Sequence, residues 1–397
     1  MEAYRVWSEI DLDALAWNLA SIRARIGASR SIMLVVKADA YGHGAIAVAH
    51  HALRHGVEAF GVGTSAEALS LRKAGLRARL LVLGTIVEDE APACLRHGIE
   101  IAVHSADRCR RLQALARRMD VRARVHLKID TGMGRLGVMP ARALSLLELI
   151  HASPNLELSG VMTHMSAATG ALDPHTQGQM SQFDGVLAAA RERGLLRGPV
   201  HAANSACIFT GLEPLYDMVR PGISAYGVLP GKLPGASELE PVMSLHTQVV
   251  FLKDLPAGAP VGYSGTFKAK RATRIAILPL GYHDGVNWRL GNRGAALVRG
   301  GRAPIVGRVS MDYTTLDVTD IPQVRVGDRV TLIGRQGEHV IRLEDLAKAA
   351  KTIAYEISCA VGQRVERVYV GGEDVVPRRR ARSEPARPAA LEPSAGS

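Results

Sequence analysis

The segment SIMLVVKADAYGHGAIAVAHHALRHGVEAFGV (31–62) is one unit of a pattern that repeats along much of this 397-residue chain. An apolar run at 32–36 is followed by a helical stretch at 45–54 and by a second apolar run at 59–62. A helix between two short strands is typical of parallel sheets, because the crossover lets consecutive strands run in the same direction. The segment therefore predicts an α/β fold.

The same alternation extends from about residue 11 to residue 220. Asp11 is a good N-cap, and apolar residues then recur at helical spacing from Leu12 to Ile26. Further strands are expected at 80–83, 99–103, 125–129, 158–162 and 200–203, with a last one ending at Val219, and helical stretches such as 66–73 and 106–118 lie between them. This length and period favour an N-terminal (β/α)8 TIM-type barrel over an open doubly wound sheet. The first strand is also not followed by the GxGxxG fingerprint of dinucleotide-binding folds.

The sequence changes character after about residue 240. Short β-rich runs at 247–252, 274–278 and 329–333 are separated by Gly and Pro turns, and one helix is expected at 343–350. We therefore expect a barrel at 9–240, a smaller, mainly β C-terminal domain at 241–372 with which residues 1–8 pair, and a disordered tail at 373–397.

Composition narrows the function. The net charge of +11 comes from 49 basic and 38 acidic residues, but 40 of the basic residues are Arg scattered through amphipathic segments and only nine are Lys. Aromatic residues make up 4%, so we expect no nucleic-acid partner and no membrane contact. The four cysteines lack ligand spacing, so no metal site is expected. The acidic N-terminus lacks the features of a signal peptide, which favours a cytoplasmic protein.

Polar residues close five of the eight expected strands, at the barrel end where catalytic residues usually lie. These strand ends carry Lys37, Lys128 with Arg135, His164, His201 with Asn204 and Ser205, and Arg220 with Gly222 and Ile223. A single Lys or His after a strand is usually solvated or structural, so the convergence of five strand ends is what favours a site. Because this chain uses Arg for most positive charges, Lys at two of these positions indicates a need for an amine that can lose its proton.

The strand-end residues match the needs of one cofactor. Lys37 is a candidate to form a Schiff base with a carbonyl. Asn204, Ser205 and the backbone of Gly222 and Ile223 offer donors to a phosphate group. A Schiff-base Lys beside a phosphate site points to pyridoxal 5'-phosphate, with Arg220 at the ring nitrogen. An Arg there stays charged and leaves the ring nitrogen largely unprotonated, which suits racemisation better than transamination.

The chain resembles the alanine racemase family of barrel-type, fold type III pyridoxal phosphate enzymes. The matching motifs, in order, are VVKADAYGHG (35–44), KIDTGMGRLG (128–137), MTH (162–164), HAANSA (201–206), VRPGISAYG (219–227), VGYSGTF (261–267), PLGYHDG (279–285), GRVSMD (307–312) and YEISC (355–359). The match spans about residues 4–370, and its first and fifth segments are the most specific.

The resemblance implies a role for each matching residue. Lys37 would bind the cofactor and move a proton on one face of the substrate Cα, and Tyr263 would serve the other face. The cofactor would be held by Lys37, Tyr41, Arg135, His164, Asn204, Ser205, Arg220, Gly222, Ile223 and Tyr355. Arg135 and Met311 would bind the substrate carboxylate, and the supporting residues would be Lys128 as a possible carbamate, His201, Tyr282 and Asp312.

The resemblance also implies an assembly and a biological role. Tyr263 lies outside the expected barrel, and in the family this residue reaches the active site of the partner subunit. The chain would thus be a homodimer with shared sites that interconverts L-alanine and D-alanine and supplies D-alanine for peptidoglycan.

Three residues differ from the family pattern, and three other functions are alternatives to alanine racemisation. Asp39, His283 and Ser310 stand where the family commonly has Asn, Ala and Cys, so a racemase acting on serine or larger amino acids remains an alternative. A metal-dependent barrel hydrolase would need a His-x-His pair on the first strand, which is absent. A pyridoxal phosphate decarboxylase would place acidic groups where Arg220 and Arg135 stand, and a non-catalytic pyridoxal phosphate carrier would not need Tyr263.

Overall fold

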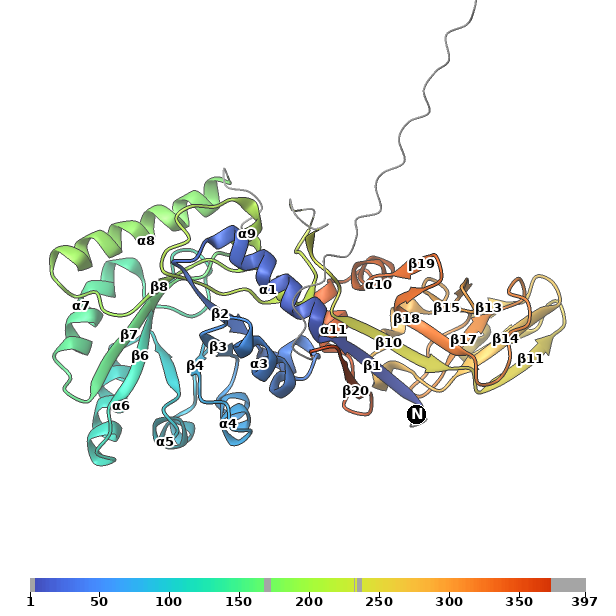
Figure 1. Cartoon of the computed structure of the whole chain (residues 1–397), viewed down its shortest axis with the longest axis horizontal. Helices are drawn as coiled ribbons and strands as arrows, with labels where there is room; N and C mark the ends of the chain where they lie inside the picture. Colours follow the sequence, from blue (N-terminus) through green and yellow to red (C-terminus); the bar gives the residue numbers. More distant parts are fainter. Residues whose placement is uncertain (1–3, 168–172, 232, 234–237, 373–397) are drawn as a thin grey trace, which may run out of the picture.

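The computed structural model describes residues 4–167, 173–231, 233 and 238–372. A barrel and a smaller β-rich unit form the two ends of an elongated molecule (Figure 1). The expected disordered tail at 373–397 lies outside the described residues.

Eight parallel strands form the barrel in the order β8-β7-β6-β5-β4-β3-β2-β9. Their bounds are β2 (Ser31–Val35), β3 (Ala59–Val62), β4 (Arg79–Val82), β5 (Glu100–Val103), β6 (Ala123–Lys128), β7 (Leu156–Met162), β8 (Val200–His201) and β9 (Met218–Val219). A parallel bridge between Asn204 and Arg220 links the ends of β8 and β9. The predicted (β/α)8 barrel is confirmed, and each strand overlaps one expected apolar run, with ends that differ by one or two residues in several strands.

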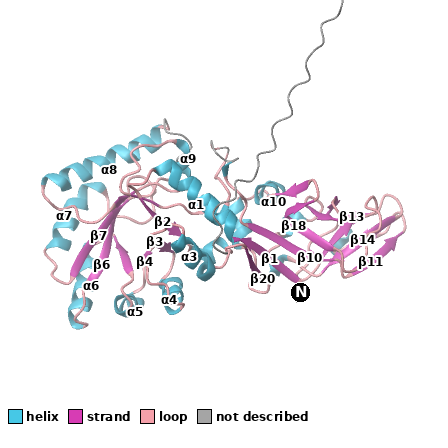
Figure 2. Ribbon diagram, in the orientation of Figure 1, coloured by secondary structure: helices cyan, strands magenta, loops and turns pink. Residues whose placement is uncertain are grey.

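Helices cover the outside of the barrel (Figure 2). They are α1 (Leu12–Ile26), α3 (Ala45–Arg54), α4 (Ser65–Lys73), α5 (Ala91–Arg96), α6 (Ala106–Arg118), α7 (Pro140–His151), α8 (Pro174–Glu192) and α9 (Ser205–Thr210). The short segment α2 (Lys37–Tyr41), between β2 and α3, has a left-handed backbone. The helix α1 begins as predicted, since the Asp11 carboxylate accepts a hydrogen bond from the backbone of Ala14 at 2.9 Å. Inside the barrel, six strands contribute to a separate apolar cluster made of Met33, Ala59, Leu81, Ala102, Met162 and Met218.

The C-terminal unit contains three sheets, of seven, three and two strands, and includes the strand β1 near the start of the chain. The strand β1 (Val6–Asp11) pairs antiparallel with β10 (Met243–Gln248) and parallel with β20 (Glu366–Val370). The remaining strands are β11 (Phe251–Leu255), β12 (Pro260–Val261), β13 (Phe267–Lys268), β14 (Thr273–Leu278), β15 (Ala295–Val298), β16 (Gly301–Pro304), β17 (Thr314–Asp317), β18 (Arg329–Gln336) and β19 (His339–Ile341). Residues at both ends of the described chain thus build one sheet.

Two details of this unit differ from the sequence prediction. The run expected at 247–252 is split between β10 and β11, which belong to different sheets. The sequence did not show the break between β10 and β11, because Val249, which lies between the two strands, is apolar and buried. The helix expected at 343–350 is confirmed as α10 (Leu343–Ala350), but a second helix, α11 (Ala354–Cys359), follows it. Six residues are too few to show helical periodicity in a sequence.

Candidate active site

The candidate site lies at the end of the barrel where the strands terminate. Lys37 follows β2, Lys128 ends β6, His164 follows β7 and Arg220 follows β9, so parallel strands bring them to one rim. Burial lowers the pKa of the His164 imidazole to about 3, and the positive charges of Arg220, Lys128, Arg135 and Lys37 add to this effect. Five basic groups predicted from four strand ends therefore lie within electrostatic reach of one another.

Lys37 and Tyr41 are joined by an unusual turn of backbone. The four residues 38–41 have φ angles from 52° to 55°, a left-handed conformation that costs non-glycine residues roughly 1–2 kcal/mol each. Local hydrogen bonds offset this cost. The Asp39 carboxylate accepts from the backbone of Ala45 at 2.7 Å, and the buried His43 Nδ1 donates to the carbonyls of Ala40 and Tyr41. Such a turn is typical of functional sites.

Glu67 also holds this turn, although sequence analysis missed it. Its carboxylate accepts hydrogen bonds from the backbone N–H groups of Ala38 and Gly63 at 2.7 and 2.8 Å. Glu67 is at the same time the third residue of a capping box with Thr64 at the start of α4. The Thr-x-x-Glu spacing after an apolar run is the signal that would have found it.

Arg220 is the most buried charged group of the rim, with 4% of its surface exposed. Its guanidinium donates to the carbonyls of Thr163 and Ala202 at 2.8 and 3.1 Å and to Nδ1 of His201 at 2.9 Å. Nδ1 of His164 lies 3.4 Å away. Burial lowers the pKa of Arg220 to about 10. All four acceptors are neutral, so they orient the guanidinium without neutralising its charge.

Ser205, Gly222 and Tyr41 form a compact polar cradle beside Arg220. Ser205 Oγ accepts from the backbone N–H of Gly222 at 2.9 Å and from that of Ser224 at 3.2 Å. A Cβ atom on Gly222 would lie 2.6 Å from the Tyr41 hydroxyl, so any larger residue here would displace the phenol from the cradle. The ring of Tyr355 lies 6.0 Å from that of Tyr41. Donors of this kind suit a phosphate group.

Two other predicted residues adjoin the cradle. Asn204 caps α9 by accepting hydrogen bonds from the backbone of Ala206 and Cys207, and Ile223 is buried behind Gly222. In this structure both contribute to the shape of the cradle, through capping and packing.

Lys128 is an amine in a largely buried, positively charged environment. Its Nζ donates to the carbonyl of Leu83 at 2.9 Å. Burial lowers the pKa of Lys128 to about 8, with further contributions from Arg220, Arg135 and Lys37. A fraction of this amine is therefore neutral near physiological pH, as carbamate formation requires. Arg135 is exposed on the loop after β6, where Asp130 binds its backbone N–H at 3.1 Å.

Comparison with known proteins gives the family. The family model described as alanine racemase, N-terminal domain, matches residues 10–230, and the model of the alanine racemase C-terminal domain matches residues 242–369. The chain belongs to the alanine racemase family. An alanine racemase from Halothermothrix orenii is 40% identical over 370 residues, which cover 92% of this chain and 98% of the relative. The prediction of an enzyme of this family is confirmed.

Solved structures agree with this assignment. The alanine racemase from a D-cycloserine-producing Streptomyces lavendulae has a TM-score of 0.87 and 34% identity, and the match covers 94% of this chain and 99% of that one. The alanine racemase from Bartonella henselae with covalently bound pyridoxal phosphate has a TM-score of 0.83 and 30% identity, covering 92% and 99%.

The remaining predicted residues of this alanine racemase family member lie in the C-terminal unit. Tyr263 is 70% exposed and Met311 is 53% exposed, and Tyr263 precedes β13, in the part of the unit that points away from the barrel (Figure 1). Their loops are neighbours, because the Cβ position of Gly262 lies 3.3 Å from the backbone N of Arg308. Tyr263 and Met311 are therefore exposed on neighbouring loops of the C-terminal unit.

The other residues of this surface are held by an ion-pair network. Arg364 bridges Asp284 and Asp312 at 3.1 and 2.9 Å, so Asp312 fixes the loop that carries Met311. Tyr282, next to Asp284, is 45% exposed. In the described part of the chain, no helix is long and apolar enough to cross a membrane. No group of three or more His, Cys, Asp or Glu residues among the described residues could hold a metal ion.

Proposed function

We propose that the chain is a pyridoxal 5'-phosphate-dependent racemase that interconverts L-alanine and D-alanine. The observation that carries this proposal is the gathering of Lys37, Lys128, Arg135 and His164 around a buried Arg220 whose hydrogen-bond acceptors are neutral. A positive site of this kind favours a ligand with a phosphate and a carboxylate, which are the charges of the cofactor and of an amino acid.

The residues at the rim fit the cofactor group by group. Lys37 offers the amine that an aldehyde requires, and Ser205, Gly222, Tyr41 and Tyr355 surround a space whose shape depends on the missing Cβ of Gly222. Arg220 would meet the ring nitrogen. When bound, the cofactor supplies an aldehyde that captures amino groups and a ring that accepts electron density from the substrate Cα.

Inversion at Cα requires an acid on one face and a base on the other. We assign Nζ of Lys37 to one face and the hydroxyl of Tyr263 to the other, so that one group removes the Cα proton while the other delivers a proton. A phenol ordinarily has a pKa near 10, so a phenolic base generally needs a neighbouring group to work at neutral pH. His164, 3.4 Å from Arg220, could give this help across the subunit interface.

The assembly follows from the position of Tyr263. Because this side chain is 70% exposed on the C-terminal unit, we propose a homodimer in which Tyr263 of the partner subunit completes the site that contains Lys37. Met311 would accompany it and, with Arg135, hold the substrate carboxylate.

Substrate range depends on the loops of this surface. The Ser310 hydroxyl donates to the carbonyl of Tyr313 and accepts from its N–H, so it stabilises its own loop and is occupied. This favours alanine as substrate, and serine or larger amino acids remain the alternative because His283 is exposed. We place the enzyme in the cytoplasm, where D-alanine would enter peptidoglycan synthesis.

Two linked measurements test the proposed function. The purified protein should show a visible absorption band that borohydride reduction fixes to Lys37, as located by peptide mass spectrometry. Solvent deuterium should then enter Cα of L-alanine and D-alanine, with serine, lysine and arginine compared alongside. A protein without the band, or with the band and no Cα exchange on any amino acid, would contradict the proposal.

A further inference from the structure

A continuous line of polar side chains crosses the barrel from Arg220 to its opposite end. His201 accepts from Arg220 at 2.9 Å, its Nε2 lies 2.9 Å from Nδ1 of His126, and Nε2 of His126 lies 2.7 Å from the Glu100 carboxylate. Arg79 closes the line with two hydrogen bonds to Glu100 at 2.9 and 3.0 Å. These contacts join strands β9, β8, β6, β5 and β4 through the barrel interior.

The groups at the two ends fix the direction of every hydrogen bond between them. A guanidinium can only donate and a carboxylate can only accept. Nδ1 of His201 must therefore be the acceptor from Arg220, its Nε2–H must donate to His126, and Nε2–H of His126 must donate to Glu100. Burial lowers the pKa of both imidazoles, so each is neutral with a single proton on Nε2.

The backbone around His126 is adapted to this line. The pairing of β6 with β7 shifts register between Val125 and His126, and His126 lies opposite Gly160. A Cβ atom on Gly160 would lie 2.5 Å from Nδ1 of His126, so the ring occupies space that only glycine leaves free. Bulges commonly serve to re-aim a side chain.

Burying these polar side chains costs stability, which suggests that the line has a function. Glu100, His126 and His201 are at most 1% exposed, in a barrel interior that apolar side chains could fill. Burying such groups stabilises a protein less than apolar packing of the same volume. The line is complete, however, and a fully satisfied polar network holds its members in one geometry.

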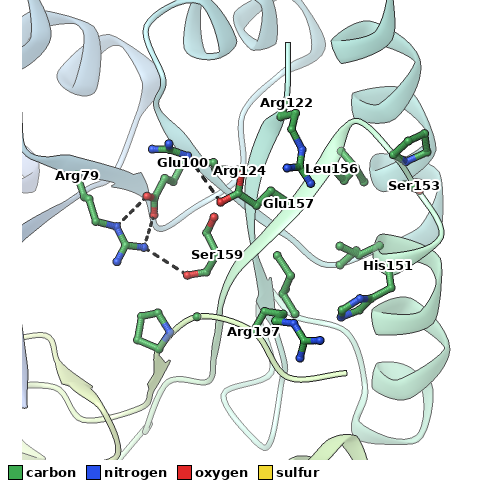
Figure 3. A pocket seen from close by; sticks show the side chains of 15 residues that line it. Arg79, Glu100, Arg122, Arg124, His151, Ser153, Leu156, Glu157, Ser159 and Arg197 are labelled. Atoms are coloured by element: carbon green, nitrogen blue, oxygen red, sulfur yellow. Dashed lines mark hydrogen bonds and ion pairs between the residues drawn. The ribbon is translucent and has the colours of Figure 1, made fainter. Parts of the chain in front are cut away.

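The outer end of the line anchors the carboxylate. Figure 3 shows Arg79 reaching both oxygens of Glu100 and the backbone carbonyl of Ser159, which is 3.3 Å from the guanidinium. These groups line a pocket of about 600 Å³ at the ends where the strands begin. Burial alone would raise the pKa of Glu100, but hydrogen bonds from His126 and Arg79 outweigh it and lower the pKa to about 2. Glu100 is therefore ionised at every physiological pH.

We propose that Glu100 is a positioning residue for the active site, acting through His126 and His201 to hold the guanidinium of Arg220 in one orientation. The catalytic part of this inference rests on the proposed function, because it assumes that Arg220 meets the bound cofactor. The structural part, a single direction of hydrogen bonding, does not.

The substitution Glu100→Gln tests the proposal with little change in shape. An amide can donate as well as accept, so it no longer imposes a direction. In part of the molecules both imidazoles reverse, and the resulting Nδ1–H of His201 then faces the N–H groups of Arg220 without an acceptor. The matched control is Glu157→Gln, since Glu157 lines the same pocket and lies 3.9 Å from Arg124, outside the line.

The first measurement is ¹⁵N NMR of the full-length holoenzyme labelled at histidine, with signals assigned through His126→Asn and His201→Asn. The wild type and Glu157→Gln should show only Nε2-protonated rings at both positions, and Glu100→Gln should add an Nδ1-protonated population. The second measurement is alanine racemisation. Glu100→Gln should lower kcat about tenfold, the lower end of the range for residues that orient a binding group through hydrogen bonds, with KM within about twofold, and Glu100→Asp should restore most of the loss.

A second pair of variants reaches the same line without removing a polar group. Gly160→Ala places a methyl group against the His126 ring and should lower kcat about as much as Glu100→Gln. Ser159→Ala alters the neighbouring residue, whose hydroxyl is not part of the line, and should leave kcat unchanged. This pair of variants also tests the proposal if Glu100→Gln fails to fold.

Several results would overturn the proposal. These are Nδ1-protonated His126 or His201 in the wild type, a single tautomer in Glu100→Gln, or a wild-type kcat in Glu100→Gln or Gly160→Ala. A wild type with the predicted tautomers but no exchange at Cα of any amino acid would instead contradict the proposed function.

Discussion

The arginines at the two ends of the barrel have different hydrogen-bond partners. At the end where strands begin, Arg79 forms a two-point ion pair with Glu100. At the end where strands terminate, Arg220 is held by carbonyl oxygens and imidazoles, beside the basic side chains of Lys37, Lys128 and Arg135. The first arrangement neutralises a charge within the fold, and the second keeps charge available. The difference indicates which end is built for an anionic ligand.

The largest effect is expected at Lys37. In Lys37→Ala the amine is lost, and racemisation should fall roughly 10⁴-fold or more, as for other groups that make covalent bonds. A coupled assay for D-alanine measures the rate, and borohydride should then fix no cofactor to the protein. Lys253→Ala, which alters an exposed lysine of β11, is the control. Activity in Lys37→Ala within tenfold of the wild type would exclude the assigned role.

The same substitution at the two ends makes the comparison direct. Arg220→Lys cannot fill four contacts at once, and the resulting misplacement should lower kcat about 100-fold. Arg79→Lys keeps a positive charge beside Glu100, whose carboxylate can still only accept from His126, and should change kcat less than about twofold. Steady-state kinetics of both variants would show this. Equal losses at the two ends would mean that the contrast in pairing has no functional meaning.

A smaller effect is expected in the cradle. Gly222→Ala places a Cβ 2.6 Å from the Tyr41 hydroxyl, and an overlap costing about 1–3 kcal/mol should weaken cofactor binding about tenfold. Equilibrium dialysis of the cofactor provides the measurement. The exposed Gly178 in α8 has open space around its Cβ position, so Gly178→Ala should bind the cofactor normally. Unchanged binding in Gly222→Ala would place the phosphate elsewhere.

The smallest effect concerns Lys128 and depends on pH. Its pKa is lowered to about 8 in the folded state, so the neutral, carbamate-forming amine increases as the pH rises through 8. Below pH 8 the buried charge of Lys128 lowers the free energy of unfolding. This loss of stability becomes smaller as the pH rises from 8 to about 10.4, the ordinary pKa of a lysine. Bicarbonate at pH 8, where about half of the amine is neutral, should raise activity modestly, and Lys128→Arg should not respond. A response in Lys128→Arg would assign the effect to another group.

The sequence was most informative where one physical pattern dominates. Short apolar runs separated by helices predicted all eight barrel strands, because parallel strands are buried on both faces. The residues that follow these runs predicted the rim for the same reason. The strand boundaries of the C-terminal unit were harder to predict, since Val249 is apolar and buried although it lies between two strands.

Other features depend on contacts that no local pattern encodes. Glu100 and His126 are 26 residues apart and lie on different strands, so only the closed barrel reveals that they touch. The hydrogen bond from Gly222 to Ser205 likewise requires two strand ends to meet. The exposure of Tyr263 on the C-terminal unit is likewise visible only in the folded chain.

The central claim, an alanine racemase site built from two subunits, is tested most directly by mixing two inactive variants. Lys37→Ala and Tyr263→Ala proteins are combined at equal amounts, subunit exchange is verified by native mass spectrometry, and racemisation of alanine is measured. Half of the dimers should then be hybrids with one intact site of two, which restores about a quarter of wild-type activity. No recovery after verified exchange would show that Lys37 and Tyr263 do not act in one shared site.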